Sequence, residues 1–240
     1  MAEISKNLFK LKHKYCSAVV VAAGVSERMG EDKLSLEVGG IPVLLRSLLC
    51  LERCEEIDEI IVVTQPERLA EVSRLCKNGG VTKAAKVVCG GATRTQSALA
   101  GVCAAERKAK IICIHDAARP FASDKLICGA VRAALDHKSV APAVPVKDTI
   151  RIVGGGSTET PERETVFAMQ TPQAFDADII KAALTAAVQS GKSFTDDCAA
   201  AEAIGVPTHL TRGDEDNIKL TTPLDLPLAE AIAAKWGETP

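Results

Sequence analysis

Short apolar runs alternate with amphipathic stretches along the first two thirds of the chain. The runs cover 18–23, 57–63, 84–88, 110–114 and 140–144. Each is too short for a buried helix, and such runs are typical of strands buried on both faces of a parallel sheet. In the stretches between them, leucine and alanine recur at helical spacing. The pattern predicts an α/β fold with a single doubly wound, mostly parallel sheet.

The alternation breaks at about 147–169, where two apolar stretches flank a glycine-rich tip. We expect a protruding β-hairpin arm here. Its apolar side chains, among them Ile152 and Phe167, need a surface that buries them, and a second subunit is a natural one. The sequence therefore predicts a homodimer formed through this arm. A polar break at 170–173 separates the arm from the next predicted helix, 176–189.

The length of 240 residues suits one α/β domain, and no internal repeat is evident. We expect this domain at 16–240. The preceding segment holds four lysines and no apolar core, which predicts a flexible basic tail at 1–15 rather than a signal peptide.

Acidic and basic residues nearly balance, with 29 lysines and arginines against 31 acidic residues. A net charge of −2 gives no overall attraction to nucleic acid or to a membrane surface. An aromatic content of 3% argues against a platform for stacking bases. No apolar run is long enough to cross a bilayer. We therefore expect a cytoplasmic protein with no membrane and no nucleic-acid partner.

The nine cysteines are odd in number, and none forms a C-x2-C pair. Most lie in apolar segments, which favours buried, reduced thiols in a cytosolic protein. Cys50 and Cys54, four residues apart on a predicted helix, are a weak metal candidate.

The first apolar run leads into a turn that contains Gly24, Ser26 and Gly30, followed closely by the bases Arg28 and Lys33. Backbone N–H groups in such a turn form a concave anion site, and open α/β sheets bind ligands at the carboxyl ends of their strands. This favours a polyphosphate site. G-x-G-x-x-G and the Walker A sequence are absent. A plain strand and turn with two solvated bases explains the stretch equally well.

A second glycine-rich turn follows the third run, and Thr93 and Gln96 in it have the spacing of a capping box. Arg94 and Ser97 add donors in the first turn of the helix that it predicts. Because Arg94 opposes the helix dipole there, we expect it to have another partner. After the fourth run, Asp116 and Arg119 can bind a hydroxyl and an anion, or pair with each other. His115, between them and the run, is interpreted as structural.

Seven ordered segments between residues 22 and 221 together resemble one family. They are A-A-G-V-S-E-R-M-G-E-D-K, G-G-A-T-R-T-Q-S, H-D-A-A-R-P-F, P-V-K-D-T, Q-T-P-Q, T-D-D and D-N-I-K-L-T. The chain is similar to the 2-C-methyl-D-erythritol 4-phosphate cytidylyltransferases of the non-mevalonate isoprenoid pathway. The resemblance implies a glycosyltransferase-A-like nucleotidyltransferase fold with a dimerisation arm. It also implies transfer of cytidylyl from CTP to this polyol phosphate, with Mg2+ as cofactor and release of pyrophosphate.

The resemblance also implies roles for individual residues. It makes Arg28, Lys33 and Lys219 the catalytic cations. The nucleotide site would comprise Ala23, Gly24, Gly91, Arg94 and Ser97. The residues on the acceptor side would be Asp116, Arg119, Thr149, Arg163, Thr171, Thr195 and Lys219, with Arg163 reaching the partner's site from the arm. It leaves the metal ligands open.

The chain departs from the family pattern in the first turn, where Ser26 replaces a common glycine and the spacing of Arg28 and Lys33 is two residues shorter. Ala92 stands where some members carry an acid. Two alternatives remain open: a ribitol-5-phosphate cytidylyltransferase of similar fold, and a non-catalytic nucleotide-binding module. An NAD-dependent oxidoreductase lacks support because its glycine motif is missing.

Overall fold

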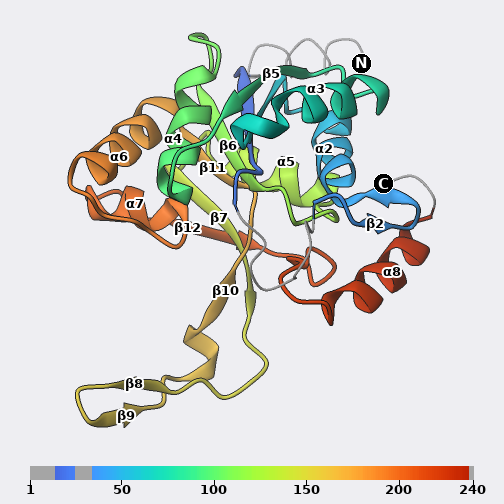
Figure 1. The fold of residues 1–240 in the computed structure, drawn as a ribbon. Coiled ribbons are helices and arrows are strands. Elements are labelled where there is room, and N and C mark those ends of the chain that lie inside the picture. Colours follow the sequence, from blue (N-terminus) through green and yellow to red (C-terminus); the bar gives the residue numbers. More distant parts are fainter. Residues whose placement is uncertain (1–13, 25–33, 238–240) are drawn as a thin grey trace, which may run out of the picture.

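A computed structural model describes residues 14–24 and 34–237 of the chain (Figure 1). Its centre is an eight-stranded sheet with the order β10-β7-β11-β6-β1-β4-β5, and β12 pairs with β7. The strands are β1 (Cys16–Val21), β4 (Glu59–Thr64), β5 (Ala84–Cys89), β6 (Ile111–Asp116), β7 (Ser139–Pro145), β10 (Phe167–Met169), β11 (Gln173–Asp176) and β12 (His209–Arg212). The pairs among β6, β1, β4 and β5 are parallel, as is the pair of β7 with β12. The predicted mostly parallel α/β sheet is confirmed.

Helices cover both faces of this sheet (Figure 1). They are α2 (Val43–Arg53), η1 (Pro66–Arg68), α3 (Leu69–Asn78), α4 (Arg94–Ala104), α5 (Asp124–Ala133), α6 (Ala177–Gln189), α7 (Asp197–Ala203) and α8 (Asp225–Trp236). The short helix η2 (Arg163–Thr165) belongs to the arm segment instead. One apolar core lies between the sheet and α2, α3, α5 and α8, and a second lies under α4, α6 and α7. The two cores explain why the strand sequences are apolar on consecutive residues.

β1 is the middle strand of the parallel part and is buried almost throughout. At its carboxyl end Val21 is in register with Asp116 of β6 and with Val63 of β4. The loops after these strands therefore meet at one edge of the sheet, where a doubly wound fold binds its ligands.

The sequence pattern missed strand β11. The polar break predicted at 170–173 ends in this strand, which runs antiparallel between β6 and β7. Its four residues include a glutamine and an aspartate, too few apolar positions to show a period. The Asp176 side chain accepts hydrogen bonds from the N–H groups of Asp178 and Ile179 and so caps α6.

The arm projects from the body of the molecule (Figure 1). It carries the hairpin of β8 (Ile152–Gly154) and β9 (Ser157–Glu159), with Gly155 and Gly156 at positive φ in the tip. The predicted two-stranded arm is confirmed in outline, although its last residues, β10, pair with β7 in the main sheet. Val153 is 77% exposed and Phe167 41%, so its apolar side chains are not covered within one chain. Burial by a second subunit stays a prediction.

A further small hairpin, β2 (Glu37–Val38) and β3 (Ile41–Pro42), precedes α2. Most of the predicted basic tail, residues 1–13, lies outside the described residues. Among the helices that the structure describes, none has the length and apolar character needed to cross a membrane.

Gly101 lets α4 approach the sheet closely. A Cβ atom at this position would overlap Val19 Cγ1 and lie 2.7 Å from Val63 Cγ2. We expect Gly101→Ala to destabilise the protein by about 1–3 kcal/mol, because Val19 and Val63 are fully buried and β-branched side chains are stiff at χ1. Gly129→Ala in α5 is the matched control: a Cβ there meets no atom within 4 Å, and better helix propensity adds about 0.5–1 kcal/mol. Urea unfolding checks both, and equal shifts would contradict the packing argument.

Candidate functional site

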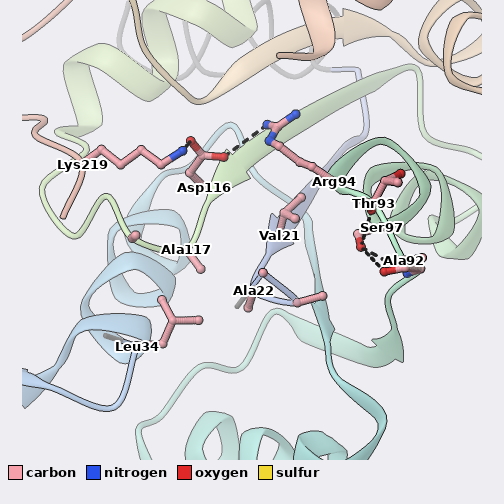
Figure 2. A pocket seen from close by; sticks show the side chains of 14 residues that line it. Val21, Ala22, Leu34, Ala92, Thr93, Arg94, Ser97, Asp116, Ala117 and Lys219 are labelled. Atoms are coloured by element: carbon pink, nitrogen blue, oxygen red, sulfur yellow. Dashed lines mark hydrogen bonds and ion pairs between the residues drawn. The ribbon is translucent and has the colours of Figure 1, made fainter. Parts of the chain in front are cut away.

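A cavity of about 230 Å3 lies at the carboxyl ends of β1 and β6 and beside the first turn of α4 (Figure 2). Seven of the predicted site residues line it: Ala23, Gly24, Gly91, Arg94, Ser97, Asp116 and Lys219. They come from four separate loops or element ends, which the parallel strands bring together. Arg28 and Lys33 belong to the segment 25–33, which lies outside the described residues.

Asp116, at the end of β6, is the centre of the charged part of this cavity (Figure 2). Its Oδ1 is 3.2 Å from Arg94 Nη2, and its Oδ2 is 2.8 Å from Lys219 Nζ. The Arg119 guanidinium approaches Oδ2 to 3.8 Å. Three cations thus meet at one carboxylate, so the cluster is positive in sum and suited to anions.

These charges shift the titration of the cluster. Burial raises the pKa of the Asp116 carboxyl, but Arg94, Lys219 and Arg119 outweigh burial and hold this pKa well below its usual range. Burial lowers the pKa of Arg94, but the carboxylates of Asp197 and Asp116 more than offset this and raise it. Asp116 is therefore ionised at neutral pH and is an acceptor of hydrogen bonds, not a general acid.

Asp197 is a member of the site that sequence reasoning did not single out. Its Oδ2 is 2.8 Å from Arg94 Nη2, and its side chain is 1% exposed. It opens α7, where Gln173 Oε1 accepts hydrogen bonds from the N–H groups of Asp197 and Cys198. Arg94 is therefore clamped between two carboxylates, which is the partner expected for it. The signal available in the sequence was the second acid of T-D-D. Asp196 by itself caps α7, which leaves Asp197 for another role.

The second glycine-rich turn forms one wall of the cavity. The predicted capping box is confirmed, with Thr93 and Gln96 bonded reciprocally. Ser97 Oγ accepts a hydrogen bond from Gly91 N at 3.1 Å and lies 3.0 Å from Thr93 O. The Ser97 hydroxyl thus holds the turn in shape. A Cβ at Gly91 would overlap the Gln96 side chain, so the turn needs glycine there. Contact of Gly91 and Ser97 with a base stays a prediction.

His115 and Thr171 support the loop that carries Asp116. His115 Nε2 is 3.1 Å from Arg119 O, and because a carbonyl only accepts, this nitrogen carries the proton. Nδ1 therefore accepts from Thr171 Oγ1 at 3.0 Å, and that hydroxyl accepts from Asp116 N. His115 is fully buried, and the structural interpretation is confirmed. The Thr171 hydroxyl, predicted to bind the acceptor, has its proton engaged here.

Arg119 and Asn217 connect this loop to the Lys219 segment. Arg119 Nη1 donates to Asn217 O at 2.8 Å. The buried Asn217 side chain donates to Thr171 O at 2.8 Å. Leu220 N donates to Ala118 O at 2.9 Å. Sequence reasoning missed Asn217, although it stands in the D-N-I-K-L-T segment.

Arg119 and Thr171 contact Asp116 but do not line the cavity, and three further predicted residues also lie outside its lining. Thr149 and Arg163 line a separate hollow of about 220 Å3 in the arm. Thr195 is exposed, two residues before Asp197. One chain does not bring the arm residues to Asp116, which is the placement expected of groups that serve another subunit.

The donor set of the described residues offers no ready-made metal site. No group of three or more histidine, cysteine or acidic side chains in 14–24 and 34–237 could hold a metal ion. Cys50 and Cys54 therefore gain no support as metal ligands. Cys50 Sγ instead donates to Pro120 O.

A mostly parallel sheet with a glycine turn and clustered cations at its carboxyl edge is typical of an α/β protein that binds a nucleotide or another phosphate-bearing ligand. The model of the 2-C-methyl-D-erythritol 4-phosphate cytidylyltransferase (IspD) family matches residues 16–235. The chain belongs to this family.

Individual relatives agree. The 2-C-methyl-D-erythritol 4-phosphate cytidylyltransferase of Caldanaerobacter subterraneus is 39% identical over 228 residues, covering 91% of this chain and 99% of the relative. That of Geobacillus kaustophilus is 41% identical over 220 residues, covering 90% and 96%. The crystal structure of 4-diphosphocytidyl-2C-methyl-D-erythritol synthase from Anaerococcus prevotii gives a TM-score of 0.82 at 32% identity, covering 91% of this chain and 96% of that one.

Proposed function

We propose that this cavity is where the chain transfers cytidylyl from CTP to 2-C-methyl-D-erythritol 4-phosphate, forming 4-diphosphocytidyl-2-C-methyl-D-erythritol and pyrophosphate for isoprenoid precursors. The observation that carries the proposal is the meeting of Arg94, Arg119 and Lys219 at Asp116 beside a glycine-walled cavity. Family membership supplies the substrates. Ribitol 5-phosphate, the alternative from sequence, gains no support from the relatives.

The chemistry suits such a cluster. The acceptor phosphate is already ionised at neutral pH, so its oxygen attacks the α-phosphorus without a strong base, and pyrophosphate leaves. The protein must hold two anions in line and offset the charge that builds up. Lys219 is 40% exposed on the cavity wall, so it can move from Asp116 to a phosphate oxygen. Arg94 is held on both sides and keeps Asp116 in place. Arg28 and Lys33 are assigned to the triphosphate by resemblance.

Mg2+ is part of this proposal, and the described residues of the cavity could hold it only together with oxygens of the substrate. Asp116 is the sole carboxylate among the described residues that line the cavity. Mg2+ commonly binds through one or two carboxylates together with substrate phosphates. The triphosphate oxygens would therefore hold most of the ion, with Asp116 as its protein ligand. Bound in this way, Mg2+ supplies positive charge at the phosphates.

We further propose that the protein works as a homodimer, with Thr149 and Arg163 of one arm completing the other subunit's site. The exposed apolar side chains of the arm support this arrangement. So does the hollow in the arm, which shares no lining residue with the cavity around Asp116. Localisation in the cytoplasm is also proposed. Nine unpaired cysteines favour a reducing compartment.

The activity is tested by pyrophosphate release from purified protein with Mg2+, CTP and the methylerythritol phosphate, and with ribitol 5-phosphate in parallel. We expect release with the first acceptor. Release with ribitol 5-phosphate alone would move the protein to the other acceptor, and silence with both would overturn the proposal.

Mixing two inactive variants tests the shared site. Arg163→Ala and Lys219→Ala each damage a different half of a site that two chains build. After subunit exchange, each mixed dimer carries one intact site, so an equal mixture should recover about a quarter of wild-type activity. No recovery, with exchange verified by native mass spectrometry, would show that Arg163 does not act across the dimer.

A further inference from the structure

Two cysteines from separate helices meet on the side of the sheet that carries α2 and α5. Cys54, which ends α2, and Cys128, in α5, place their Sγ atoms 3.3 Å apart. Cys54 is 1% exposed, whereas Cys128 is half-buried. A disulfide bond needs about 2.05 Å between the sulfurs, so the two atoms must approach by roughly a further 1.2 Å to form it.

Cys128 is reachable from solvent. It lines a groove of about 860 Å3 between α5, the end of β7 and the 211–216 segment, which is within the size range of small-molecule sites. Arg132, one helical turn further along α5, lines the same groove and binds Glu56 at 2.7 Å. Its guanidinium adds a positive charge to the wall that Cys128 also lines.

We propose that Cys54 and Cys128 form a reversible disulfide bond when a low-molecular-mass disulfide enters this groove. The Cys128 thiolate attacks one sulfur of that disulfide, expels one small thiolate and becomes a mixed disulfide. Cys54 Sγ then attacks Cys128 Sγ and expels the second small thiolate. The two protein protons end on the two released thiols, so two protein thiols are oxidised and one small disulfide is reduced.

The order of attack follows from burial. Burial and the hydrogen bond with Cys128 raise the pKa of the Cys54 thiol well above its ordinary value. Cys54 is therefore the resolving thiol, reacting only when a mixed disulfide is already beside it. The bond would join α2 to α5, the helices that support the loop behind Asp116. In that loop Ala117 O accepts from Ser47 of α2 at 2.7 Å.

The test uses the full chain with the exposed Cys89 and Cys103 replaced by serine, and oxidised glutathione as the probe. Intact mass should show the loss of two hydrogens and no retained glutathione. Peptide mapping should join the Cys54 and Cys128 peptides, and a thiol reductant should reverse the bond. The thermal midpoint should rise on oxidation, because the bond restricts the unfolded chain.

Cys54→Ser in the same background is the matched control and should trap glutathione on Cys128. Blocking Cys128 with iodoacetamide before oxidation tests the same point without a mutation in the core. A mixed disulfide that persists on Cys128 while Cys54 is intact would overturn the proposal. So would an unreactive Cys128, or a disulfide that joins other cysteines.

Discussion

Lys219→Ala is expected to lower turnover by about 10²–10³, which is the usual cost of losing one preorganised charge at a site of this kind. The ammonium lies on the cavity wall at 2.8 Å from Asp116. It is the least buried of the three cations around that carboxylate, and so the one most free to reach a phosphate. The measurement is steady-state pyrophosphate release at saturating CTP and acceptor.

The fold should survive this change. Lys219 is partly exposed, and Asp116 keeps Arg94 as a partner at 3.2 Å. The thermal midpoint should therefore stay close to the wild-type value. Lys235→Ala is the control. It removes an exposed lysine of α8 that pairs with Asp216. It should keep full turnover, because surface ion pairs contribute little to stability. Near-normal turnover of Lys219→Ala would contradict its assigned role.

We expect Arg28→Ala to lower turnover by a similar factor.

Much of the fold follows from the sequence because buried parallel strands and helices have distinct periods. The 3.6-residue pattern and the short apolar runs located the elements of the parallel half and the arm. Strand β11 was missed for a physical reason. It is stabilised by pairing with β6 and β7 on both sides. Four residues that follow a proline and end in the helix cap itself show no pattern of their own.

The site residues likewise fall into those that the sequence predicts and those that it does not. Residues in glycine-rich turns after strands, such as Gly91 and Arg94, were predictable because their neighbours in sequence define the turn. Asp197 and Asn217 were missed because their partners are 103 and 46 residues away. Only the folded chain shows that Arg94 needs a second carboxylate. Arg94 itself was singled out by its unfavourable place at a helix start, an electrostatic conflict that sequence does reveal.

Acidification should destabilise the protein through His115. Complete burial lowers the pKa of His115 from its ordinary 6.5 to about 4. The hydrogen bond to Arg119 O and the charge of Asp116 oppose this shift, and the cations of Arg119 and Lys219 add to it. The unfolded chain therefore binds a proton at this ring below pH 6.5, and the folded protein only below about 4. The free energy of unfolding therefore decreases as the pH is lowered through that window, by about 3 kcal/mol in total. Protonation would also put a donor at Nδ1, where Thr171 now donates.

His115→Gln removes the titration while keeping one donor for Arg119 O and one acceptor for the Thr171 hydroxyl. The free energy of unfolding from urea titrations at pH 7 and pH 5 should then fall less steeply in the variant than in the wild type. Between pH 7 and pH 5 the wild type should lose about 2 kcal/mol more than the variant, since pH 5 lies 1.5 units below the ordinary pKa. Asp116 does not disturb this comparison. Its pKa is lowered from 3.8 in the folded state, so its contribution is lost only at pH values below the range measured. Equal slopes in the two proteins would mean that His115 is not held neutral by its burial, and that the support of the Asp116 loop does not depend on an uncharged ring.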